Sequence, residues 1–136
     1  MEGIVEMKND EQIKKDVLEY IMTTELPNEV TGVVKRDRRP TDSNAEDVII
    51  SVLANENGQI QVCTVNVNIY VKDKPAGRQK DPNHDRLDTL ASMSAQIFEV
   101  FRGNNYRAHL KAQRITAVGE DEHVITNKIE YKQVNE

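Results

Sequence analysis

The sequence predicts an α+β fold in which two helices pack on one face of an antiparallel or mixed β-sheet. Two segments carry apolar residues at helical spacing, which gives each a single buried stripe. Two other segments read as strand pairs separated by turn-forming residues, and one of these strands is apolar on one side only. The expected order is helix, short strand, hairpin, helix, hairpin, over residues 11–26, 32–35, 47–72, 82–102 and 106–134.

The chain of 136 residues reads as a single α+β domain, residues 1–136, with residues 1–10 expected to be flexible. Its apolar runs are far shorter than the ~20 residues that cross a bilayer, so we expect no membrane contact. Glu2 and Glu6 stand where a secretory signal carries positive charge, so we expect no export by that route. The single cysteine, Cys63, is expected to be a buried thiol in a reducing compartment.

The first helix is expected over residues 11–26. Asn9 or Asp10 can cap its start, because either side chain can accept a hydrogen bond from a first-turn amide. Pro27, after Leu26, helps to stop it. Its apolar stripe consists of Ile13, Val17, Tyr20 and Ile21.

A short strand at residues 32–35 and a long exposed loop at residues 35–47 are expected to follow, because this stretch is rich in charges and turn formers. The next strands, 47–54 and 59–72, form a hairpin through Asn57-Gly58, a pair that readily adopts the positive φ angles of tight turns. The first of these strands is apolar at nearly every position, which predicts that it is covered on both sides.

Residues 62–71 alternate almost without a break, so the second strand of this hairpin has two different faces. The face expected to meet the core contains Cys63, Val65, Val67, Ile69 and Val71. The other face contains Val62, Thr64, Asn66, Asn68 and Tyr70. This second face is polar but weakly charged, which suits either water or an interface that forms hydrogen bonds. The sequence leaves both alternatives open.

After an exposed loop at residues 72–81, the second helix is expected to begin near Pro82 and to run through Arg102. Asp81 can cap it, and proline fits the first helical position because it has no N–H to satisfy. Gly103 supplies the stop. The buried stripe consists of Leu87, Leu90, Ala91, Ser94, Ile97, Phe98 and Phe101.

The last two strands form a second hairpin that closes the chain. Alternation changes parity in the first strand, which predicts a β-bulge near Gln113 or Arg114. The second strand places Ile125, Asn127, Ile129 and Tyr131 on one face.

No catalytic motif stands out. His84, His109 and His123 have no second ligand at metal spacing beside them, so we expect structural or solvent-exposed roles for all three. Glycine-rich phosphate loops and serine-nucleophile signatures are absent from the sequence. We therefore expect a protein that is not an enzyme and has no cofactor or bound metal.

One catalytic alternative is a carboxylate cluster at the start of the second helix. Asp81, Asp85 and Asp88 could share a divalent cation of the kind used by phosphodiester-cleaving nucleases. Acids in a first turn are also what the helix dipole favours, and Arg86 and Lys80 could simply pair with them.

The charges are unevenly placed. The net charge of −5 argues against a protein whose whole surface binds nucleic acid. Separated basic and acidic loops suit head-to-tail contacts between copies, or simply solvent. The basic loops carry Lys35, Arg36, Arg38 and Arg39, and Lys72, Lys74, Arg78 and Lys80; the acids are Glu120, Asp121 and Glu122.

The order and content of these elements resemble the tail-terminator or tail-completion proteins at the neck of long-tailed bacteriophages. The stretches that carry the resemblance are "IKKDVLEYIM", "EDVIISVLANENGQIQVCTVNVNIYV", "HDRLDTLASMSAQIFEVFRG" and "HVITNKIEYKQV". The likeness covers most of the chain from Glu11 onward and rests on pattern, without an invariant motif. A head-tail connector of related fold, and outside this class a generic cytosolic adaptor, are the other non-enzymatic alternatives.

The resemblance implies a structural virion protein, assembled in the host bacterial cytoplasm. Such a protein forms a homo-oligomeric ring, commonly a hexamer, that ends the tail tube and joins it to the head connector. DNA passes through the ring without sequence-specific binding. The residues expected to contact neighbouring copies or the tube are Lys35, Arg36, Arg38, Arg39, Thr64, Asn66, Asn68, Tyr70, Lys74 and Arg78.

Overall fold

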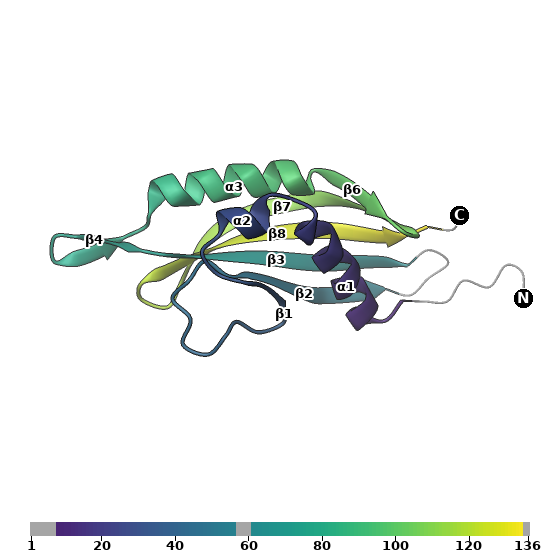
Figure 1. Cartoon of the computed structure of the whole chain (residues 1–136), viewed down its shortest axis with the longest axis horizontal. Helices are drawn as coiled ribbons and strands as arrows, with labels where there is room; N and C mark the ends of the chain where they lie inside the picture. The colour runs from purple at the N-terminus through teal and green to yellow at the C-terminus, as the bar shows by residue number, and fades with distance from the viewer. Residues whose placement is uncertain (1–7, 57–60, 135–136) are drawn as a thin grey trace, which may run out of the picture.

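The fold is a curled, mixed β-sheet with helices packed against it, described over residues 8–56 and 61–134 of a computed structural model. Six strands form the sheet in the order β1-β2-β3-β8-β7-β6, and a two-stranded hairpin, β4-β5, projects from one end (Figure 1). β1 and β2 are parallel, whereas the other neighbouring pairs are antiparallel. The elements are α1 (Asp10–Met22), α2 (Leu26–Glu29), β1 (Val34–Arg36), β2 (Val48–Glu56), β3 (Val62–Lys72), β4 (Lys74–Ala76), β5 (Gln79–Asp81), α3 (His84–Phe98), β6 (Val100–Gly103), β7 (Tyr106–Val118) and β8 (Glu122–Gln133).

The α+β class is therefore confirmed, but the expected order of elements is incomplete. The structure adds α2 after the first helix, the hairpin β4-β5 where residues 72–81 were expected to form a loop, and β6 between α3 and β7. The Asn57-Gly58 turn and most of the start expected to be flexible lie outside the described residues.

α1 begins as the sequence predicts and ends early. Asn9 caps it in a reciprocal box, in which Asn9 Oδ1 accepts a hydrogen bond from the Gln12 amide at 2.9 Å and Gln12 Oε1 accepts one from the Asn9 amide at 2.8 Å. The helix ends at Met22, so Pro27 falls in the first turn of α2 and does not stop α1. The separate short helix turns the chain toward β1.

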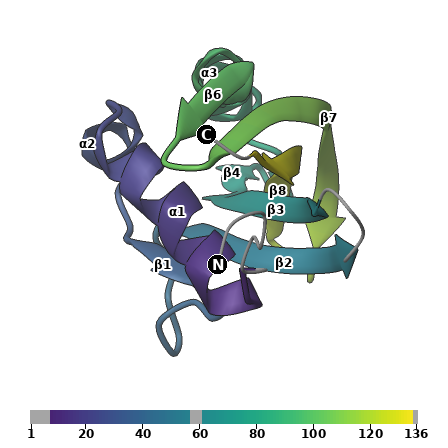
Figure 2. The ribbon, with the colours of Figure 1, turned by 90° about the vertical axis from the view of Figure 1, so that its right-hand side faces the viewer.

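One apolar core lies between the sheet and the helices. α1 packs against β1 and β2, and α3 packs against β3, β6, β7 and β8, around the curl that Figure 2 shows end-on. Tyr20 of α1 joins the two regions, because its ring stacks on Phe101 at 4.1 Å and its hydroxyl donates to the carbonyl of Ile97 at 2.5 Å.

β2 and β3 confirm the expected hairpin and its alternation. The core-facing residues of β3 are at most 2% exposed, and those of the opposite face are half-buried. Val48, Ile49 and Ile50 are buried, so the first half of β2 is covered on both faces as expected. Leu53, in its second half, is 62% exposed at an irregularity in the β2-β3 register. Only half of the strand therefore behaves as a covered strand.

α3 occupies a shorter segment than predicted. It begins at His84, its cap is Asn83, whose Oδ1 accepts from the Arg86 amide at 3.3 Å, and it ends at Phe98. The predictions of an Asp81 cap and a Gly103 stop are wrong. Phe101 was expected on the buried stripe of this helix. It lies in β6 instead, where its side chain is still buried in the core although the backbone is extended.

β7 and β8 confirm the closing hairpin. Ile125, Asn127, Ile129 and Tyr131 share one face and are all fully buried. The bulge in β7 falls at Lys111, between Leu110 and Ala112, two or three residues before the predicted place.

No helix in the described part of the chain is long and apolar enough to span a bilayer.

Candidate functional site

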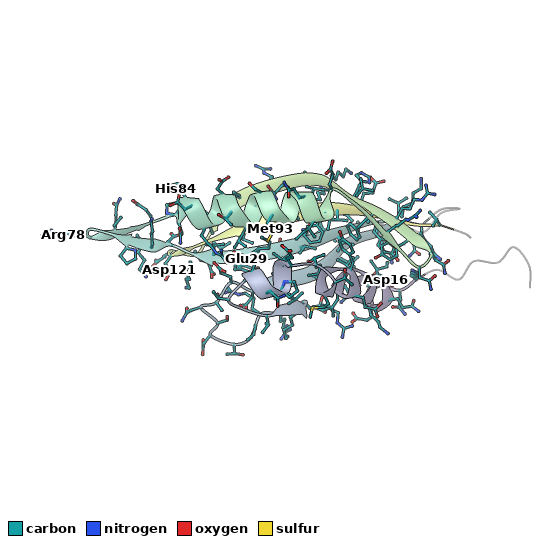
Figure 3. All side chains as sticks on the ribbon, turned by 45° about the horizontal axis from the view of Figure 1, so that its top comes forward. Asp16, Glu29, Arg78, His84, Met93 and Asp121 are labelled. Carbon is teal, nitrogen blue, oxygen red and sulfur yellow. The ribbon has the colours of Figure 1, made fainter. Side chains whose placement is uncertain are left out.

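The hairpin β4-β5, here called the arm (residues 74–81), projects beyond the body of the sheet (Figure 1). Gly77 at its tip has a φ of 64°, a left-handed conformation that glycine adopts at little cost. Lys74 and Arg78 are exposed, and Arg78 stands at the far end in Figure 3. The arm therefore carries cations well away from the core.

The base of the arm is fixed to the body. The Asp73 amide donates to the carbonyl of Asp121 at 2.9 Å, and His123 Nδ1 lies 2.7 Å from Asp73 Oδ1. Lys72 and Lys80 reach the Asp121 carboxylate at 3.2 and 3.3 Å, and their hydrogen bonds lower the pKa of Asp121. A hollow of about 630 Å³ lies between the arm and the turn that joins β7 to β8, which contains Glu120 and Asp121. The arm is thus anchored at one end and open to a partner at the other.

The basic loop splits into exposed and buried parts. Lys35, Arg36 and Arg38 are exposed, as a contact surface requires. Arg39 turns inward, where it binds Asp47 at 2.9 Å and Glu122 at 2.8 Å.

Arg39 is therefore a structural cation. Burial lowers its pKa, but the hydrogen bonds that it donates to Glu122 and Asp47 outweigh burial and raise the pKa above its usual value. Its guanidinium also lies 4.2 Å from the centre of the Tyr70 ring. The loop at residues 37–47 thus covers one end of the outer face of β3.

The rest of that outer face has no element over it among the contacts of the described residues. Thr64, Asn66 and Asn68 are half-buried between the side chains of β2 and β8. The Oδ1 atoms of Asn66 and Asn68 are inaccessible and accept no hydrogen bond from a described residue. The face is polar, as the sequence indicates, and the structure leaves it open.

A groove of about 600 Å³ lies between α3 and β7. Ala91 and Ala95 of α3 form one wall, and Gln113 and Ile115 of β7 form the other. Gln113 fixes the strand to the helix, because its Nε2 donates to the carbonyl of Ala91 at 2.9 Å. The rim carries His84, Asp88 and His123. The groove is mainly aliphatic and lies beside a sheet edge.

The carboxylates of the nuclease alternative do not form a metal centre among the described residues. Asp81 lies at the end of β5 and accepts a hydrogen bond from Gln79 at 3.1 Å, whereas Asp85 and Asp88 are exposed on α3. No group of three or more His, Cys, Asp or Glu side chains in the described ranges could hold a metal ion.

Arg86 does not pair with these acids either. It binds Glu46 and Glu29, each at 2.7 Å, and these bonds raise its pKa despite an opposing effect of burial. The pairing ties α3 to α2 and to the loop before β2. The sequence gives no local indication of these partners, because Glu46 and Glu29 lie 40 and 57 residues before Arg86.

The histidines differ from one another. His84 is exposed at the first position of α3, and His109 is exposed in β7, 4.0 Å from Glu130. His123 was expected in a turn but lies in β8, half-buried against Asp73. No local sequence pattern indicates this contact, because Asp73 stands between β3 and β4, 50 residues before His123.

A buried polar cluster fastens the start of α1 to β8. Lys8 Nζ donates to Asp16 Oδ2 at 2.7 Å and to the Tyr131 hydroxyl at 2.9 Å, and that hydroxyl donates to Asp16 at 2.5 Å. Burial, reinforced by Asp16, raises the pKa of Tyr131. Lys8 Nζ also donates to the carbonyl of Asn104 at 3.1 Å, so the cluster joins α1, β8 and the turn between β6 and β7, which indicates a structural role.

No protein-family model matches the chain, and no curated protein matches its sequence.

Proposed function

We propose that this chain is a structural virion assembly protein that forms a ring of identical copies at the tail or neck of a long-tailed phage. The ring ends the tail tube, joins it to the head connector and leaves a passage for DNA. The observation that carries the proposal is the projecting cationic arm on a body whose sheet edges are only partly paired.

The arm favours contact with another chain. A two-stranded ribbon is only marginally stable by itself, and among the described elements neither a third strand nor a helix packs over this one. Its exposed cations, Lys74 at the base and Arg78 at the tip, add nothing to the core of their own chain. A neighbouring copy or a tube subunit would give the arm the packing that its own body does not supply.

The exposed cations of the loop after β1 add a second contact region. Lys35, Arg36 and Arg38 are exposed to an acidic neighbour, although Arg36 lies 3.8 Å from Glu11 and Lys35 Nζ donates to the carbonyl of Arg38 at 2.9 Å. Arg39 and Tyr70 are removed from the expected contact residues by their own pairing. Thr64, Asn66 and Asn68 stay in the proposal as a face that a hydrogen-bonding partner could cover. Identical copies joined through two different surfaces close into a ring when the rotation per copy allows it.

The phage context rests on the resemblance of the chain pattern to tail-terminator and tail-completion proteins. The structure inserts the arm between β3 and α3, and β6 between α3 and β7, so the resemblance is carried by the sequence pattern alone. No observation favours the nuclease alternative over this proposal.

The proposal is tested by reversing the charge of the arm. A double variant, Lys74→Glu with Arg78→Glu, is compared with Arg107→Glu with Lys132→Glu, which changes the same number of exposed cations on β7 and β8. Light scattering should show that the arm variant loses assembled mass while the control keeps it. Equal assembly of both variants would refute a role for the arm.

A further inference from the structure

We propose that neighbouring copies join through two unpaired half-edges of the sheet. The β7 half-edge (residues 112–118) of one copy pairs antiparallel with the β2 half-edge (residues 51–56) of the next. This inference rests on the proposed ring and specifies its interface.

Both half-edges arise because the outermost strands are short. β1 pairs only with Val48 to Ile50 of β2. The next backbone hydrogen bond, from the Asp37 amide, also goes to Ile50, so the pairing ends at that residue. β6 pairs only with Tyr106 to His109 of β7, followed by one bond from the Leu110 amide to Glu99. Within the described chain, the backbone beyond these points is paired on one side only.

The two half-edges lie on opposite sides of one cross-strand row. Ser51, Asn66, Lys128 and Ala112 pair in sequence across β2, β3, β8 and β7. The β2 half-edge extends from this row toward one end of the sheet, and the β7 half-edge extends toward the other end. Joining them shifts each copy along the strands relative to the last, a stagger of the kind that closes β-barrels.

The short strands β1 and β6 then limit how far the two half-edges can slide along each other. In the staggered arrangement, β6 of the first copy lies just beyond the C-terminal end of β2 of the second copy. β1 of the second copy lies just beyond the C-terminal end of β7 of the first copy. β2 and β7 run in opposite directions across the sheet, because each step from β2 to β3, β8 and β7 is antiparallel. An edge-to-edge contact between copies in the same orientation is therefore antiparallel.

These half-edges carry little of the usual protection against pairing. Natural edge strands are commonly blunted by charges, proline, bulges or a covering element. The β2 half-edge has one charge, Glu56 at its end, and one register irregularity at Leu53, whereas residues 112–118 contain a single charge, Arg114. Neither half-edge contains proline, and each exposes an aliphatic side chain, Leu53 at 62% and Ile115 at 46%. Weakly protected backbone beside exposed aliphatic groups indicates a surface that a partner covers.

The groove between α3 and β7 supplies space for that partner. Ile115 lines it together with the small side chains of Ala91 and Ala95. Antiparallel pairing of the half-edges brings Leu53 of the next copy, the residue without a partner in the β2-β3 register, close to Ile115 at the side of the groove. A two-fold contact of β7 with β7 would instead bring two Arg114 side chains close together, which is unfavourable. The chemistry therefore fits β2 of the next copy better than a second β7.

Cysteine cross-linking tests this interface directly. Leu53→Cys and Ile115→Cys are prepared as separate variants, and the two are mixed under a mild oxidant. The native thiol does not interfere, because Cys63 is 1% exposed and burial raises its pKa to about 11. Gln96→Cys, on the exposed side of α3, replaces Ile115→Cys in the control mixture.

The proposal predicts a disulfide-linked dimer in the Leu53→Cys and Ile115→Cys mixture, at least tenfold above either variant alone and above the Gln96→Cys control. Equal cross-linking within a single variant would overturn it in favour of a two-fold contact. Absence of the mixed dimer in samples that light scattering shows to be assembled would overturn the interface and leave the ring standing. A monomer at every concentration that also forms no ring on isolated tail tubes would overturn both.

Discussion

Replacing Asp47 with asparagine is expected to destabilise the fold by about 3 kcal/mol, because Asp47 is the centre of a buried charge network. The residue is 1% exposed. Its carboxylate accepts hydrogen bonds from Arg39 Nε at 2.9 Å, Ser43 Oγ at 2.5 Å and the Val33 amide at 3.1 Å. The asparagine keeps one acceptor oxygen but loses the charge that neutralises Arg39.

The size of the stability loss depends on the partners that Arg39 keeps in Asp47→Asn. Breaking a buried ion pair by removing one partner costs about 3–5 kcal/mol. Arg39 keeps Glu122 as a second partner and its side chain is 19% exposed, which places the loss near the lower end. A loss of about 3 kcal/mol lowers Tm by about 12 °C and the urea midpoint by about 1.5 M for a domain of this size.

The same carboxylate gives a pH signature. Burial raises the pKa of Asp47, but the bonds from Ser43, Val33 and Arg39 outweigh burial and hold it below the ordinary 3.8. A lowered folded-state pKa contributes stability that is present above the unfolded pKa and is lost as pH falls through the folded value. The difference between the native protein and Asp47→Asn should therefore shrink below about pH 4.

Urea unfolding followed by circular dichroism at pH 7 and pH 3 measures both effects. The matched control is Asp42→Asn, in the same loop, where the side chain is exposed and the φ of 56° tolerates asparagine. A loss below about 1 kcal/mol for Asp47→Asn, or one that is unchanged at pH 3, would refute the reasoning.

Three further changes test other contacts. Gly32→Ala should unfold at clearly lower urea, because its methyl group would overlap Asp47 Oδ1 and lie 2.6 Å from the Glu46 carbonyl; native-like stability would contradict this packing. Tyr131→Phe should cost about 1 kcal/mol in the same assay, because it removes the hydroxyl that bonds Asp16, and no loss would contradict that role. Cys63 should react with a thiol reagent at pH 8 only after unfolding, because it is buried and its pKa is about 11; rapid reaction of the folded protein would contradict the burial.

Strand alternation carried most of the sequence-based prediction that the structure confirms. The faces of β3 and β8 follow from side-chain period alone, because each strand packs one side against a single core. The Asn9 cap also follows from local chemistry, since its bond joins residues three apart.

The arm and the end of α3 could not be read in the same way. The arm has few apolar residues, so it carries no period-2 signal, and only Gly77 marks its turn. Phe101 sits at helical spacing after Phe98, yet pairing of β6 with β7 extends the backbone there. The extended backbone at Phe101 depends on pairing with β7, which comes later in the chain than the helical pattern that predicts α3.

The candidate contact surface was predicted in part. The exposed charges of Lys35, Arg36, Arg38, Lys74 and Arg78 could be recognised from composition. The inward turn of Arg39 depends on Glu122, 83 residues away, and no local pattern indicates it. The half-edges depend on how far β1 and β6 reach, which is a property of the assembled sheet.

The central claim is that this chain assembles into a ring, and the most direct test is its mass by light scattering over a range of concentrations, with electron microscopy of the same samples. The account predicts one discrete multiple of the chain mass and rings of fixed symmetry with a hole wide enough for DNA. A strict monomer at every concentration, which also forms no ring on isolated tail tubes, would contradict it.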